Sequence, residues 1–184
     1  MNGTINECFL DSSLLIEYIK GTQTDLLEHL FEAKTDNFIN HIVYSEFIYH
    51  FLSVMSGTSP LTLKRSERIG EILKEHKPIE FINNFKILDM DEEIIGKSNQ
   101  FMSTYNLLPN DALILATCNI YDIKYLVSFD SDFQEICDKE EMVLINSVEK
   151  FKEVGGIRIQ EEEDKDNQKT GDEIRQDDLS PGQK

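Results

Sequence analysis

Residues 110–133, NDALILATCNIYDIKYLVSFDSDF, constrain the fold more than any other stretch of this chain. Asp111 opens an apolar segment of helical length, and an apolar run suited to a strand, residues 125–129, leads directly to Asp130. The two acids lie 19 positions apart, which is about one helix, one turn and one strand. In an α/β sheet this connection returns the chain to the same edge, so we expect the two carboxylates to meet there.

The same alternation of strand and helix patterns continues through most of the chain. We predict strands over residues 6–10, 38–42, 85–88, 125–129 and 142–145. We predict helices over residues 12–20, 25–33, 43–55, 59–77, 91–105, 111–121, 132–137 and 147–153. Strands that alternate with helices predict an α/β fold in three layers, with helices on both faces of a mostly parallel five-stranded sheet. In such sheets functional groups gather beyond the carboxyl ends of the strands, at the topological switch point.

Length and composition predict one domain followed by an acidic tail. The chain has 184 residues, and a hydrophobic fraction of 40% is enough for a core that needs no covalent staples. We place the domain at residues 1–156. After Gly155 and Gly156 the apolar content collapses, and residues 157–184 cannot bury enough surface to offset the entropy of ordering. We therefore predict a disordered tail, most simply an inert one.

The formal net charge of −17 limits the kinds of partner. Residues 160–184 carry nine acidic and four basic side chains and contribute −5, which leaves −12 for residues 1–159. An acidic surface argues against sequence-independent, electrostatically driven binding of nucleic acid. It is compatible with an enzyme that concentrates carboxylates around metal ions, and with a basic protein partner.

Cysteines, histidines and hydropathy predict a soluble protein that stays in the cytoplasm. Cys8, Cys118 and Cys137 are an odd, widely spaced set, which favours reduced thiols in the core over a disulfide framework. There is no CxxC, and the four histidines lack metal-ligand spacing, which argues against zinc. The chain shows no signal segment and no apolar run near the ~20 residues that a membrane span needs.

Four acids stand at positions where parallel strands end or the next helix begins. Asp11 and Asp130 follow predicted strands, Glu46 comes four residues after a third, and Asp111 lies in a first helical turn. Taken singly, most have a structural explanation, because an acid can cap a helix or complement its dipole. Glu46 is different, since apolar neighbours surround it and an unpaired carboxylate there costs several kcal/mol. A buried salt bridge is its structural alternative.

Taken together, the four acids predict a metal site for phosphoryl transfer. Close carboxylates repel one another unless a cation compensates them, and hard divalent ions such as Mg²⁺ or Mn²⁺ take oxygen ligands. One or two such ions can activate water and stabilise the leaving oxygen of a phosphodiester. Other acid sites fit less well: Asp11 is not followed by the Asp-x-Asp of haloacid dehalogenases, and neither a phosphate-binding loop nor a nucleophile elbow is present.

Four segments, FLDSSLLIEYIKG, HIVYSEFIYHF, LPNDALILATC and YLVSFDSDF, resemble the four motifs of PIN domains, especially VapC-type ribonuclease toxins. The resemblance spans about residues 6–150 and agrees in order, spacing and apolar flanks. It implies that Asp11, Glu46, Asp111 and Asp130 are the metal-binding, catalytic acids. It further implies supporting roles for Ser12 and Ser128 beside the acids, and for Asp132, which either assists or caps the next helix.

The resemblance also implies a reaction and partners. Members of the family form homodimers, use Mg²⁺ or Mn²⁺, and hydrolyse single-stranded or looped RNA, and the toxins are blocked by a small antitoxin protein. This chain is longer and more acidic than a typical toxin. The alternatives to an inert tail are a spacer, a solubility device and an intramolecular mimic of RNA. The alternatives are a PIN nuclease of RNA processing or decay that has no antitoxin, and a scaffold that binds RNA or protein without cutting. Lys64, Arg65 and Arg68 either contact RNA phosphates or form a solvated helix face.

Overall fold

Five short strands form one sheet, and every pair of neighbouring strands in it is parallel. The computed structural model describes residues 5–155. Its strands are β1 (Glu7–Leu10), β2 (Asp36–Asn40), β3 (Lys86–Leu88), β4 (Tyr125–Val127) and β5 (Val143–Ile145), in the order β3-β2-β1-β4-β5. The predicted five-stranded parallel sheet is confirmed.

The strand order places a topological switch point beside the end of β1. From β1 the chain moves outward through β2 to β3, then crosses to the other side of β1 to form β4 and β5. The backbone N–H of Asp11, just after β1, donates to the carbonyl of Val127 at the end of β4, at 2.9 Å. The carboxyl ends of β1 and β4 therefore lie side by side, where ligands bind in open α/β sheets.

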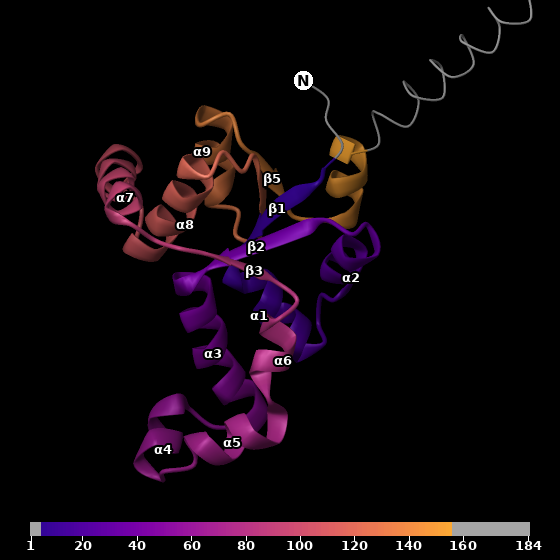
Figure 1. The fold of residues 1–184 in the computed structure, drawn as a ribbon, viewed down its shortest axis with the longest axis vertical. Coiled ribbons are helices and arrows are strands. Elements are labelled where there is room, and N and C mark those ends of the chain that lie inside the picture. The colour runs from indigo at the N-terminus through magenta and orange to yellow at the C-terminus, as the bar shows by residue number, and fades with distance from the viewer. Residues whose placement is uncertain (1–4, 156–184) are drawn as a thin grey trace, which may run out of the picture.

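Helices cover both faces of the sheet, as predicted (Figure 1). Helices α7, α8 and α9 lie on one side, and α1, α3 and α6 lie on the other, while α4 and α5 extend beyond the far end of α3. Residues 148–155 are also helical. The bounds are α1 (Ser12–Lys20), α2 (Asp25–Glu32), α3 (His41–Ser56), α4 (Pro60–Arg65), α5 (Ile69–His76), α6 (Pro78–Ile82), α7 (Glu92–Tyr105), α8 (Pro109–Ile120) and α9 (Phe133–Lys139).

The boundary between β2 and α3 lies two residues earlier than predicted. The side-chain oxygen of Asn40 accepts the backbone N–H groups of Ile42 and Val43, both at 3.0 Å, and so caps α3. Its amide donates to the Thr117 hydroxyl of α8 at 2.9 Å, which ties the end of β2 to a helix of the opposite layer. The strand predicted to reach residue 42 ends at Asn40, because a residue that caps a helix has left the strand.

The single helix predicted over residues 59–77 is wrong, because the chain forms α4 and α5 there, followed by α6. Ser59 caps α4 as expected, but Glu67 has a φ of 58° and Lys77 a φ of 43°. Left-handed residues end helices by turning the backbone out of the helical path. Pro78 then begins α6 at a first helical position, where its missing N–H does no harm.

The core confirms the predicted state of the cysteines. Cys8, Cys118 and Cys137 are all buried and free. Phe9 and Leu10, which follow Cys8 in β1, are fully buried as well. Within residues 5–155 no helix is both long and apolar enough to cross a membrane. The acidic tail predicted at residues 157–184 lies outside the described residues.

Candidate active site at the switch point

Asp11 is a buried carboxylate held by hydroxyl groups. The residue is 5% exposed, and its Oδ2 atom accepts from the Ser13 hydroxyl at 2.6 Å, the Ser128 hydroxyl at 2.8 Å and the Ser13 backbone N–H at 3.2 Å. The last bond makes Asp11 the N-cap of α1, as its position after β1 suggested. Oδ1 has only a long contact of 3.5 Å from the Ser12 hydroxyl. Asp11 is thus fixed through one oxygen at the switch point.

Ser128 links Asp11 to Asp130. This serine is fully buried, and its hydroxyl both donates to Asp11 Oδ2 and accepts the backbone N–H of Asp130 at 3.0 Å. Since β4 ends at Val127, two residues earlier than predicted, residues 128–130 form a loop that this hydroxyl holds in place. The supporting role expected of Ser128 therefore has a direct structural basis.

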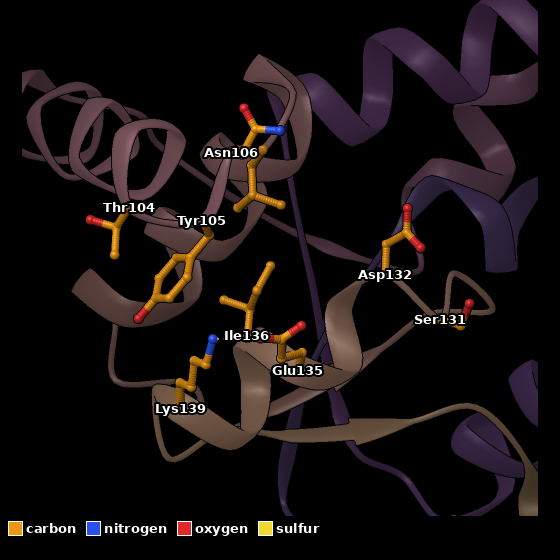
Figure 2. Close-up of a pocket in the computed structure, with 9 residues that line it drawn as sticks. Thr104, Tyr105, Asn106, Ser131, Asp132, Glu135, Ile136 and Lys139 are labelled. Carbon is orange, nitrogen blue, oxygen red and sulfur yellow. Dashed lines mark hydrogen bonds and ion pairs between the residues drawn. The ribbon is translucent and has the colours of Figure 1, made fainter.

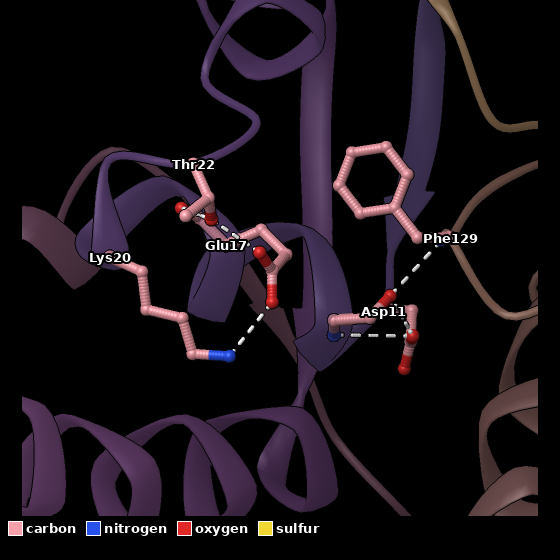
Figure 3. A network of polar contacts seen from close by, with 6 residues as sticks. Asp11, Glu17, Lys20, Thr22 and Phe129 are labelled. Carbon is pink, nitrogen blue, oxygen red and sulfur yellow. Dashed lines mark hydrogen bonds and ion pairs between the residues drawn. The ribbon is translucent and has the colours of Figure 1, made fainter.

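Ser13 was not anticipated from the sequence. Its hydroxyl donates to Asp11 and accepts the backbone N–H of Phe129 at 3.1 Å, which joins the start of α1 to the loop after β4. Figure 3 shows Asp11 and Phe129 together at this end of α1, with Glu17 further along the helix bonded to Lys20 and Thr22. The signal was the second serine after Asp11, a spacing at which a hydroxyl can reach back to the carboxylate.

Glu46 joins the same network from α3. Its Oε2 accepts from the Ser12 hydroxyl at 2.7 Å, and its Oε1 accepts from the side-chain amide of Asn110 at 2.6 Å. Glu46 is half-buried rather than enclosed by apolar side chains, and the salt-bridge alternative finds no partner for it among residues 5–155. Asn110 is a site residue that the sequence analysis missed, although it directly precedes Asp111.

Asp111 has a raised pKa because it is partly buried and lies near other acids. Burial raises the pKa of its carboxyl from the ordinary 3.8 to about 6, and negative charge on Asp130, Asp11, Glu46 and Asp132 adds to this rise in pKa. Carboxylates act on one another in this way only when they are close and poorly screened. The negative charges of Asp11, Glu46 and Asp130, the other three acids predicted from the sequence, therefore act on the Asp111 carboxyl.

Asp132 stands at the rim of this group. It precedes α9 but its side chain makes no capping bond to that helix, so the capping role considered for it is wrong. Its backbone N–H donates instead to Asp130 Oδ1 at 2.9 Å. Asp132 is exposed and lines a pocket next to the acids, together with residues of α7 and α9.

The donor set fits a hard divalent cation. Carboxylate oxygens are the ligands that Mg²⁺ and Mn²⁺ prefer. Such an ion would neutralise the negative charges of the neighbouring acids that add to the raised pKa of Asp111. In the described part of the chain, no three Asp, Glu, His or Cys residues form a ready group of metal ligands. Mg²⁺ usually binds through one or two carboxylates plus water, so a tight cage is not required.

The basic residues Lys64, Arg65 and Arg68 are not brought to the acids. Lys64 and Arg65 lie in α4, and Arg68 forms an exposed ion pair with Glu71 at 2.9 Å. Helices α4 and α5 lie past the end of α3, and α3 rises about 15 Å between Glu46 and its last residue (Figure 1). The solvated-face alternative agrees with this placement.

Comparisons with known proteins identify the family. The model of the PIN domain matches residues 8–139, a range that contains all four acids. The chain belongs to the PIN domain family. This PIN domain is 34% identical over 133 residues to a Methanocaldococcus jannaschii protein named Ribonuclease VapC2, covering 71% of this chain and 89% of the relative. It is 33% identical over 140 residues to Ribonuclease VapC6 of the same organism, covering 70% and 91%.

The fold agrees with solved structures of this kind. A chain in the DNA-bound VapBC crystal structure from Salmonella typhimurium superposes on this PIN domain with a TM-score of 0.53 and 18% identity, covering 76% of this chain and 96% of that one. At that identity the likeness concerns the fold alone. The family resemblance carried by the four sequence motifs is confirmed.

Proposed function

We propose that this PIN domain is a metal-dependent endoribonuclease that hydrolyses phosphodiester bonds in RNA. The proposal is supported by the hydrogen bonds through which Ser128 joins Asp11 to the loop of Asp130 and Ser12 contacts both Asp11 and Glu46. It is supported further by Asn110, which bonds Glu46 directly before Asp111, and by the raised pKa of Asp111. The names of its two relatives, both ribonucleases, support the choice of RNA as substrate.

The reaction needs the acids to hold charge in fixed positions. Mg²⁺ or Mn²⁺, when bound, would activate a water molecule and stabilise the leaving oxygen of the phosphodiester. Asp11, Asp111, Asp130 and Glu46 are the residues that would hold it. The chain's own polar groups position these acids: hydroxyls fix one oxygen of Asp11, and Ser12 and Asn110 fix one oxygen each of Glu46. Oδ1 of Asp11, which has only the long contact from Ser12, is left available to the ion or its bound water.

The test compares cleavage of a mixed RNA pool by the wild type and by Asp11→Asn, with Mg²⁺, Mn²⁺ or EDTA. The Asn side chain keeps an oxygen for the N-cap of α1, so the variant folds while losing the charge. We expect cleavage that requires both the metal and Asp11, with Asp25→Asn, in the exposed first turn of α2, as a matched control. Cleavage by Asp11→Asn at the wild-type rate would refute the assignment.

A scaffold that binds RNA or protein without cutting is the second candidate. It is favoured by one observation, that no three potential ligands within residues 5–155 form a ready metal group. Titration of the wild type with Mn²⁺ in a calorimeter separates the two candidates. Binding at or below millimolar concentration that is lost in Asp111→Asn supports the nuclease, and a lack of binding supports the scaffold.

We also propose that the protein is the toxin of a toxin–antitoxin pair and acts as a homodimer. A solved chain with this fold belongs to a structure described as a toxin–antitoxin complex from Klebsiella pneumoniae. An acidic protein of this kind suits a small, basic antitoxin. Growth arrest on expression, relieved by the product of a small neighbouring gene, tests the pairing. Growth unaffected by the active enzyme would favour a role in RNA processing or decay instead.

A further inference from the structure

A pocket of about 530 Å³ opens beside the acids, between the end of α7, the loop that leads to α8, and α9 with the loop before it (Figure 2). Its volume lies within the roughly 300–1,000 Å³ typical of sites for small molecules. Polar groups converge on it from both sides, and Ile136 and Leu107 supply apolar surface. Apart from Asp132 at its rim, the groups in this pocket have no role in the proposed hydrolysis, so their chemistry requires a separate explanation.

The pocket adjoins the candidate catalytic site through Asp132. This residue lines the pocket, and its backbone N–H donates to Asp130 Oδ1 at 2.9 Å. An RNA strand whose phosphate lies at the acids can therefore place a neighbouring base in the pocket. Single-stranded RNA is recognised in this way, by unstacked bases that enter pockets and pair there with side chains.

We propose that the pocket binds one RNA base, guanine by preference, next to the phosphate that is cleaved. The inference rests on the proposed function and specifies its substrate. It implies that the enzyme selects its cleavage sites partly by the identity of a single flanking base.

Tyr105 provides a stacking surface for such a base. Its ring packs against Phe101, with centroids 5.8 Å apart, and its hydroxyl donates to Glu140, which fixes the plane of the ring. The ammonium of Lys139 lies 5.5 Å from the ring centroid. Exposed lysine side chains are flexible, so a base can take this position over the ring. Base–aromatic stacking is a main source of affinity for single strands.

Glu135 and Lys139 offer a pattern of charges that matches the edge of guanine. Guanine presents two adjacent N–H donors followed by the O6 acceptor. The Glu135 carboxylate can accept both N–H groups, and the Lys139 ammonium can donate to O6. The two side chains pair with each other at 2.5 Å, but they are 79% and 51% exposed, and exposed ion pairs contribute little and open easily.

The acidity of the pocket favours a base over a second phosphate. Asp132 and Glu135 outnumber Lys139 among its charged lining residues. A phosphate would be repelled there, whereas the N–H edge of guanine is electropositive. Uracil and cytosine do not offer two adjacent donors beside an acceptor, and adenine has no oxygen at the position of O6. The pocket thus distinguishes guanine from the other three bases through the Glu135 carboxylate and the Lys139 ammonium together.

The first experiment measures binding without cleavage. Guanosine, adenosine, cytidine and uridine are titrated into ¹⁵N-labelled protein in EDTA while amide shifts are followed by NMR. We expect guanosine to shift amides of the α7–α8 loop and α9 at the lowest concentration. Tyr105→Leu should weaken this binding roughly 5- to 150-fold, whereas Tyr105→Phe, which keeps the ring, should retain it. Tyr121→Leu, whose hydroxyl also bonds a neighbour, is the matched control.

The second experiment sequences the ends produced from a random RNA pool in Mg²⁺ or Mn²⁺. Glu135→Gln should reduce the preference for guanine at the cleavage site roughly 5- to 150-fold. Glu153→Gln, which breaks a comparable exposed pair with Lys150, should change nothing. Cleavage without any base preference, or equal binding of the four nucleosides, would overturn the proposal. Guanosine bound at the pocket of a protein that cuts no RNA would instead refute the proposed nuclease and leave the pocket's ligand in place.

Discussion

Replacing Asp111 with Asn should stabilise the metal-free protein even as it abolishes cleavage. The folded protein raises the pKa of this carboxyl from 3.8 to about 6. At 1.36 kcal/mol for each pKa unit the shift corresponds to about 3 kcal/mol, and screening by solvent around a half-exposed side chain reduces this to roughly 1–2 kcal/mol. Asn loses a favourable interaction with the α8 dipole, about 0.3–1 kcal/mol. The net gain expected at pH 7.5 is about 1 kcal/mol.

The pH dependence of the effect follows from the direction of the shift. A carboxyl whose folded pKa is raised binds its proton more tightly in the folded state. The destabilisation by Asp111 is therefore complete above pH ~6 and disappears as the pH falls to ~4. The stability gap between Asp111→Asn and the wild type should close over this interval, and divalent metal at pH 7.5 should close it as well by stabilising the wild type alone.

Thermal unfolding in EDTA at pH 7.5 and pH 4.5 measures the prediction. For a domain of this size 1 kcal/mol corresponds to about 2–4 °C in Tm. Asp25→Asn serves as the control, because it removes an exposed acid from the first turn of another helix and loses only the dipole interaction. If Asp111→Asn lowers the Tm at pH 7.5 as Asp25→Asn does, the carboxylates do not repel one another and the inferred cluster is wrong.

Three further substitutions test the groups that hold the acids in place. Ser128→Ala should lower the free energy of unfolding by about 1–3 kcal/mol and reduce RNA cleavage, because it removes a buried hydroxyl with two partners. An unchanged midpoint of urea unfolding would contradict this prediction. Asn110→Ala should reduce cleavage about tenfold through Glu46 while leaving stability within about 0.5 kcal/mol, and full cleavage activity would remove Asn110 from the site. Asn40→Ala should cost about 1–3 kcal/mol, since it removes a cap and the buried bond to Thr117, which a shift in the urea midpoint would report.

Much of the fold and the four acids could be predicted because local patterns and global topology agree here. The strand that ends before Asp11 and the apolar helix that begins near Asp111 are both unambiguous in the sequence. The parallel order follows from alternating strands and helices, and it alone brings Asp11 to the loop before Asp130. The prediction that the acids converge rests on this topology.

The features that could not be predicted depend on contacts between distant segments. Asn110 supports Glu46 across 64 positions of sequence, and no spacing rule links the two. The break at Glu67 arises where a non-glycine residue adopts a left-handed conformation, which composition does not reveal. The pocket beside Asp132 likewise requires Tyr105 and Lys139 to meet, and they come from different helices. Such contacts become visible only when the chain is folded.

The central position of β1 determines when the proposed active site can first form during synthesis. Leu10 pairs with Val127, so the strand that completes the site leaves the ribosome long after β1 does. Asp11, Glu46 and Asp111 are synthesised before the loop that carries Ser128 and Asp130, and until that loop arrives Asp11 lacks its Ser128 partner. The proposed site therefore stays incomplete in a nascent chain until nearly the whole domain has been made. If the protein hydrolyses RNA as proposed, this order of synthesis keeps the activity away from the message and the ribosome that produce it.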